Sequence, residues 1–92
     1  MSEVRDIQWD VIGGRIRAWR EGQEPRVSLD RLADLLAERG CTRPSTAKLS
    51  RIESGSHPAV PDIVPALEAV TRIPAADLRP DLAAMFRREP NQ

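Results

Sequence analysis

The chain has 92 residues, of which 40% are hydrophobic and 30% are charged, and this suffices for one small packed domain. Its single cysteine excludes an internal disulfide. No apolar run approaches the roughly 20 residues that cross a membrane, and the first residues lack the apolar core of a signal peptide. We therefore expect a cytoplasmic protein. The formal net charge of zero does not exclude a nucleic-acid partner, because the distribution of charge along the chain matters more than its sum.

The N-terminal part of the chain predicts a helix over residues 9–21, after an extension over residues 1–8. Its apolar residues recur at helical spacing: Trp9, Ile12, Ile16 and Trp19. Gly13 and Gly14 lower the helix propensity of this stretch, and they mark either the start of the core helix or the close approach of another backbone.

Two further helices are predicted in tandem, over residues 28–39 and 45–54. Ser28 and Ser45 each precede an apolar repeat, and a serine oxygen at that position can accept a backbone N–H and cap the first turn. Gly55 can adopt the left-handed conformation that ends the third helix.

The C-terminal part predicts a helix over residues 61–71, a helical turn over residues 75–79 and a short sixth helix over residues 81–88. A polar tail over residues 89–92 follows. Because aromatic residues are scarce, Leu, Ile, Val and Ala must fill the core, which favours helices. We therefore expect one all-α domain over residues 9–88.

A basic segment coincides with the third predicted helix and the connector before it. Residues 39–52 carry four basic and no acidic residues, whereas the segments on both sides carry more acidic than basic residues. Leu49 and Ile52 share one face of the helix, so its polar face remains for a partner, and small polar residues with a long cation suit the base edges and phosphates of DNA. Two short helices in tandem, the second one basic and capped, indicate a helix-turn-helix. The alternative is that a chain of mixed charge carries such a segment by chance.

Several segments of the chain resemble the Cro/repressor family of helix-turn-helix proteins, which is also called lambda-repressor-like or XRE-type. The segments are Gly14-Arg15-Ile16-Arg17 followed by Arg20, Ser28-Leu29-Asp30-Arg31-Leu32-Ala33, and Leu49-Ser50-Arg51-Ile52-Glu53-Ser54-Gly55. Ile73-Pro74-Ala75-Ala76-Asp77-Leu78 resembles the closing helix of that fold, and residues 78–82 resemble the tail of small phage Cro-like and antitoxin-type members.

The resemblance implies a five-helix bundle that inserts its third helix, residues 45–54, into the major groove of double-stranded DNA. It also implies an ion pair between Arg20 and Glu53, which would tie the first helix to the third. The chain departs from the family pattern in two places. If Leu32-Ala33 is the family's Leu-Ala, the segment before the third helix is longer than the family's by about six residues, so the second helix is expected to extend to Arg39. Where the family often has Lys or Arg after the third helix, this chain offers only His57.

The same resemblance suggests which residues contact DNA. The expected base-reading residues are Thr46, Ala47, Lys48 and Arg51, of which Arg51 is best suited to a bidentate contact with guanine. The expected phosphate contacts are Ser28, Arg43, Ser45, Ser56 and Arg17. For each arginine the alternative is a solvated surface position.

The chain predicts no enzyme, no cofactor and no metal site. His57 is the one histidine and cannot build a metal cluster, and the acidic residues are scattered. Cys41 lies between Arg39 and Arg43 and is either a redox thiol or a packed or loop cysteine, of which the second is the better interpretation. An enzyme regulated by Cys41 therefore has little support.

We expect a sequence-specific DNA-binding transcriptional regulator, a repressor, that acts as a homodimer because one short helix covers only a half-site. The alternative is an antitoxin or another protein-interaction module on the same scaffold, which the neutral charge and the apolar C-terminal residues favour. The dimer surface is expected either around the N-terminal extension with Trp9 or around Val64, Leu67, Leu82, Met85 and Phe86.

Overall fold

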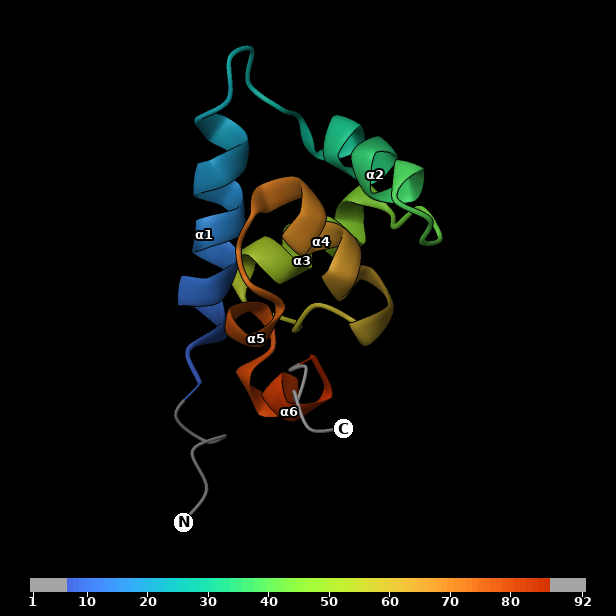
Figure 1. The fold of residues 1–92 in the computed structure, drawn as a ribbon. Coiled ribbons are helices and arrows are strands. Elements are labelled where there is room, and N and C mark those ends of the chain that lie inside the picture. Colours follow the sequence, from blue (N-terminus) through green and yellow to red (C-terminus); the bar gives the residue numbers. More distant parts are fainter. Residues whose placement is uncertain (1–6, 87–92) are drawn as a thin grey trace.

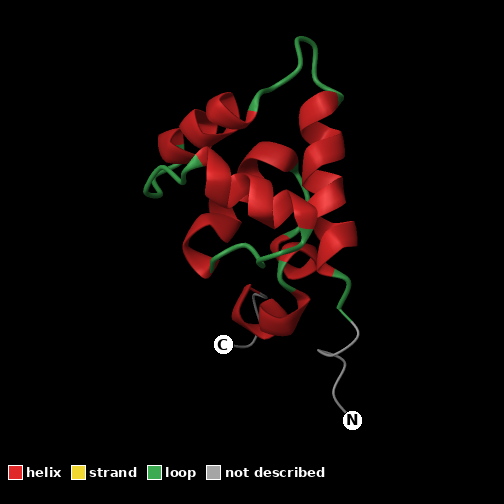
Figure 2. Ribbon diagram, turned by 180° about the vertical axis from the view of Figure 1, so that it is seen from behind, coloured by secondary structure: helices red, strands yellow, loops and turns green. Residues whose placement is uncertain are grey.

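The computed structural model describes residues 7–86, and this part of the chain is all-α (Figure 1). Its helices are α1 (Trp9–Glu21), α2 (Leu29–Glu38), α3 (Thr46–Ser54), α4 (Val64–Thr71), α5 (Ala75–Leu78) and α6 (Ala83–Phe86), with 3-10 turns at Pro61–Ile63 and Pro80–Leu82. Figure 2 shows these helices joined by loops, with no strand among the described residues, which confirms the predicted fold class. The predicted polar tail, the end of the predicted sixth helix and most of the predicted N-terminal extension lie outside the described residues.

The second and third helices begin where their sequence signals predict. Ser28 and Ser45 directly precede α2 and α3, and each side-chain oxygen accepts a hydrogen bond, at 3.0 Å, from the backbone N–H three residues later. Gly55 directly follows α3 with a φ of 89°, the left-handed conformation that glycine adopts without strain. These caps satisfy backbone groups that a helix end leaves unpaired, and so they set the start of α2 and both ends of α3.

The helix predicted over residues 61–71 begins as a 3-10 turn, and α4 itself starts at Val64. The cause is Pro65, which has no N–H to donate to the carbonyl oxygen of Pro61 and whose ring would collide with that carbonyl in a continuous α-helix. The chain therefore makes the tighter turn first. α4 ends at Thr71, as predicted.

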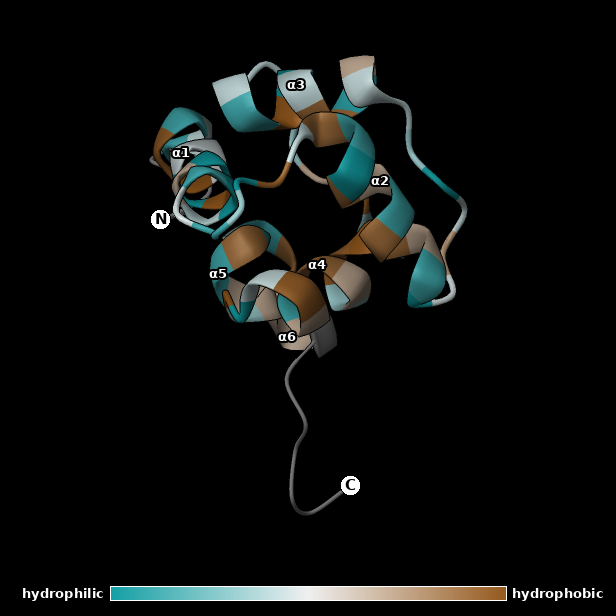
Figure 3. Cartoon of the chain, turned by 90° about the horizontal axis from the view of Figure 1, so that it is seen from above, coloured by the Kyte–Doolittle hydropathy of each residue, from teal (hydrophilic) through white to brown (hydrophobic). Residues whose placement is uncertain are grey.

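Aliphatic side chains from five helices form one core. The most deeply buried are Ile16, Leu32, Leu36, Leu49, Val64, Leu67 and Leu78. α1 runs along one side of the bundle (Figure 1), and both α1 and α2 pack against α3. Seen from above, α3 lies on the side of the bundle opposite α6, with α4 and α5 between them (Figure 3). The fold thus places α3 at one side of the molecule.

The structure corrects one expectation about self-association. Val64 and Leu67 have no exposed surface, because both side chains fill the core of the chain itself. A second copy cannot reach them on the folded monomer, so the expectation that they help to build a dimer surface is wrong. The other C-terminal residues named for that surface are Leu82, which is half-buried, and Met85 and Phe86, whose side chains lie outside the described residues.

Candidate nucleic-acid interface

α3 has one face in the core and one in solvent. Leu49 and Ile52 are only 2% and 3% exposed and belong to the core. The residues expected to read bases are all exposed: Thr46, Ala47, Lys48 and Arg51. An α-helix with its side chains is about 10–12 Å across, and the major groove of DNA is about 12 Å wide. A helix such as α3, whose polar face is exposed, can therefore enter that groove.

α1 and the end of α3 lie in direct backbone contact, and Gly13 on α1 is one of the glycines that permit it. A Cβ atom added at Gly13 would collide with the backbone carbonyl oxygens of Ile52 and Glu53, whereas one added at Gly14 would meet no atom within 4 Å. Of the two alternatives for this pair of glycines, Gly13 marks the close approach of another backbone, and the helix begins before it, at Trp9. The contact fixes how far the end of α3 lies from α1.

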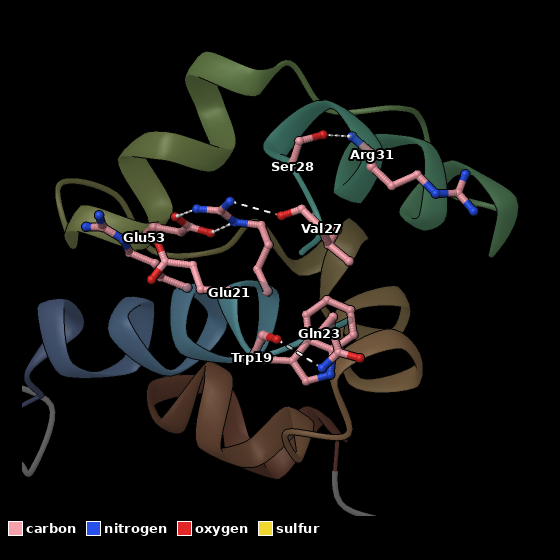
Figure 4. A network of polar contacts seen from close by, with 9 residues as sticks. Trp19, Glu21, Gln23, Val27, Ser28, Arg31 and Glu53 are labelled. Carbon is pink, nitrogen blue, oxygen red and sulfur yellow. Dashed lines mark hydrogen bonds and ion pairs between the residues drawn. The ribbon is translucent and has the colours of Figure 1, made fainter. Parts of the chain in front are cut away.

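Arg20 and Glu53, the residues that the resemblance pairs, are in direct contact. Nε and Nη2 of Arg20 donate to the two carboxylate oxygens of Glu53 at 2.8 and 2.9 Å, and Nη1 donates to the carbonyl oxygen of Val27 at 3.0 Å (Figure 4). The two side chains are only 10% and 8% exposed. The pKa of Arg20 is raised, chiefly by its hydrogen bond with Glu53. This network joins α1, α3 and the loop before α2.

The three serines expected to contact phosphates are exposed, and each takes part in a hydrogen bond within the chain. Ser28 and Ser45 accept the cap bonds described above, and Oγ of Ser56 lies 2.9 Å from Oγ of Ser54. A hydroxyl that caps a helix accepts through a lone pair and keeps its proton, so it can still donate to a phosphate oxygen.

The two arginines expected to contact phosphates lie against acidic side chains. Nε of Arg43 donates to Asp34 at 2.8 Å and Nη2 donates to Asp30 at 2.7 Å, and these bonds, that with Asp34 foremost, raise the pKa of Arg43. Arg17 donates to Glu21, one turn later in α1, at 3.0 Å. The charges of both arginines are compensated within the chain, and Arg43 ties the connector between α2 and α3 to α2.

Lys48 and Arg51 differ from these arginines, because neither forms an ion pair within residues 7–86. They lie three residues apart on α3, a spacing that places them as neighbours on one side of a helix. Two exposed and uncompensated cations on one helix face attract a polyanion.

Arg79 is a structural residue that sequence reasoning missed. Its guanidinium donates two hydrogen bonds to Asp81, at 2.9 and 2.7 Å, and a third to the carbonyl oxygen of Ala59, at 2.6 Å. It also lies 5.5 Å from the centre of the half-buried Trp9 ring. The bond from Arg79 lowers the pKa of Asp81. Arg79 thus connects the loop after α3 with the 3-10 turn after α5, and the spacing of Arg79 and Asp81 is the only part of this contact visible in the sequence.

A metal site and a helical membrane span each have requirements that the described residues do not meet. Within residues 7–86, no group of three or more His, Cys, Asp and Glu side chains is placed to hold a metal ion, and no helix has the length and apolar character to cross a membrane. Cys41 is half-buried, and its thiol donates to the carbonyl oxygen of Leu36 at 3.2 Å. Comparison of the chain with protein-family models, with curated proteins and with solved structures gives no match.

Proposed function

We propose that this protein is a Cro/repressor-type helix-turn-helix domain that binds double-stranded DNA in a sequence-dependent way and represses transcription. α3 enters the major groove, where Thr46, Ala47, Lys48 and Arg51 contact base edges. The protein binds as a homodimer, because α3 covers only one half of a symmetric site.

The observation that supports this proposal most is the division of α3 into two faces. Its apolar residues are buried, while Lys48 and Arg51 are exposed without an acidic partner among the described residues. Every other arginine on α1, α2 and α3 is paired with an acidic side chain, so within the described part of the chain Lys48 and Arg51 are the uncompensated cations of these three helices. A helix with that charge, held rigidly by Gly13 and the buried ion pair of Arg20, suits the anionic groove of DNA.

Phosphate contacts are the second element of the proposal. The hydroxyls of Ser28 and Ser45 lie at the N-termini of α2 and α3, where the partial positive charge of the helix end favours an anion. Ser56 adds a hydroxyl just beyond α3. Arg17 and Arg43 contribute only if the phosphate competes with their carboxylate partners, so we assign the larger electrostatic effect to α3.

A salt titration of binding to random-sequence duplexes tests the proposal. The logarithm of the association constant should fall with the logarithm of salt concentration, with a slope of several units, because each phosphate contact releases counterions. On random duplexes we expect Lys48 and Arg51 to lie against phosphates, so the double variant Lys48→Gln/Arg51→Gln should lose about one unit of slope per removed cation and protomer. Arg72→Gln, in the turn between α4 and α5, is the matched loss of an exposed charge and should keep the wild-type slope. An affinity independent of salt would contradict the proposal.

A second candidate function is a protein-interaction module, such as an antitoxin, on the same scaffold. Two observations favour it: the chain has no net charge, and residues 39–45 form a connector longer than the three to four residues usual for a helix-turn-helix. The salt titration separates the two functions, because a module of this kind binds random duplexes weakly and without the slope carried by Lys48 and Arg51.

A further inference from the structure

A cavity of about 380 Å³ lies between α3 and the loop that follows it. Its lining combines the cations Lys48, Arg51 and Arg79 with His57 and with apolar residues that include Pro58 and Val60. Pockets that bind small molecules have volumes of about 300–1,000 Å³ and combine apolar walls with a few polar groups. The cavity therefore has the size of a small-molecule site.

The lining divides into an apolar wall and a cationic rim, with no acidic residue in contact with the cavity. Prolines and aliphatic side chains form the wall. On the rim, Arg79 is engaged by Asp81, whereas Lys48 and Arg51 have no acidic partner among residues 7–86. The ligand that complements this lining has an apolar body and one anionic group.

The loop that forms the wall is held in place by the chain itself. The N–H groups of Ser56 and His57 donate to the carbonyl oxygen of Arg51 at 2.9 and 3.3 Å, and the guanidinium of Arg79 donates to the carbonyl oxygen of Ala59 at 2.6 Å. Ala59 itself is buried. Because these bonds are made within the chain, its own contacts position the loop that forms the wall of the cavity.

We propose that this cavity binds a small organic anion with an aromatic or aliphatic body, whose acidic group is held by Arg51 and Lys48. In the part of this inference that rests on the proposed function, the ligand competes with DNA, because it engages the same two cations. The chain would then carry a ligand-controlled switch next to α3.

The fluorescent anion anilinonaphthalene sulfonate is a suitable probe, with the uncharged phenyl-naphthylamine as its matched neutral analogue. We expect saturable binding of one anion per chain, at least about tenfold tighter than binding of the neutral analogue, because the charge-assisted contacts are then present. Arg51→Gln, at an exposed position, should weaken the anion about tenfold. Val60→Phe should weaken both dyes by filling the wall, and Arg72→Gln should change neither.

Circular dichroism shows whether each variant keeps the fold, and Arg51→Gln alone decides the inference if Val60→Phe unfolds. Absence of saturable dye binding, equal affinity for both dyes, or unchanged affinity in Arg51→Gln would overturn it. A duplex that displaces the anion supports the competition, and simultaneous binding of both overturns that part. Dye binding without any DNA binding would contradict the proposed function and support the anion site in the cavity. DNA binding without dye binding would support the proposed function and contradict the anion site.

Discussion

Replacing Arg20 with alanine should destabilise the fold strongly, because it leaves the carboxylate of Glu53 buried without its counter-charge. Both side chains are at most 10% exposed, and the arginine makes three hydrogen bonds that join α1, α3 and the loop before α2. Removing one partner of such a pair costs about 3–5 kcal/mol. A small domain has a total stability of about 5–15 kcal/mol and loses about 4–8 °C of melting temperature per kcal/mol, so the melting temperature should fall by about 12 °C or more.

Arg17→Ala is the matched control, since it removes an arginine and an ion pair from the same helix. Arg17 and Glu21 are 64% and 38% exposed, and such a pair contributes about 0.3–0.5 kcal/mol, which corresponds to no more than about 4 °C. Thermal melts followed by far-ultraviolet circular dichroism, and urea unfolding followed by tryptophan fluorescence, measure both changes. Arg20→Met combined with Glu53→Met should recover much of the loss, because neither charge then remains buried. A melting temperature of Arg20→Ala equal to that of Arg17→Ala would refute the reasoning.

Three further predictions concern the supports of α3. Gly13→Ala should lower the melting temperature severely or prevent folding, because its Cβ meets backbone atoms of α3. Gly14→Ala, in open space, should instead stabilise the helix by up to about 1 kcal/mol. Equal melting temperatures of the two variants would contradict the close contact of α1 and α3. Ser45→Ala removes the cap of α3 and should cost about 1 kcal/mol in urea unfolding; an unchanged midpoint would show that the cap does not matter. Because the bond from Arg79 lowers the pKa of Asp81, the stability it contributes is present above about pH 5 and is lost as the pH falls through the lowered value. Asp81→Asn should therefore melt below wild type at neutral pH and converge with it in strong acid, and a constant difference across the pH range would exclude Asp81 as the source.

Local cap signals predict α2 and α3 because each signal acts within one turn. The side chains of Ser28 and Ser45 accept backbone N–H groups of their own helices, and Gly55 ends its own helix in the left-handed conformation. No distant contact is needed to interpret these signals. The outward position of Lys48 and Arg51 likewise follows from the periodicity of α3. The start of α4 was harder to predict, because Pro65 permits either a first-turn position or a kink, and the structure instead places a 3-10 turn before it.

Contacts between segments that lie far apart in the chain could not be predicted from the sequence. The pairing of Arg43 with Asp30 and Asp34 depends on the path of the connector, and the bond from Arg79 to Ala59 spans 20 residues. A sequence alone does not tell an apolar residue of the monomer core from one in a dimer surface, which is why Val64 was misplaced. The pairing of Arg20 with Glu53 came from a family resemblance, since no local rule connects residues 33 positions apart.

The central claim is that the outward face of α3 distinguishes base pairs. Selection of bound duplexes from a random pool, repeated with Arg51→Ala and with Thr46→Ala, tests it most directly. The account predicts a preferred half-site for the wild type, and for each variant a loss of discrimination of about 1–3 kcal/mol at a single base pair with the other preferences kept. Preferences identical to those of the wild type in both variants would contradict the claim.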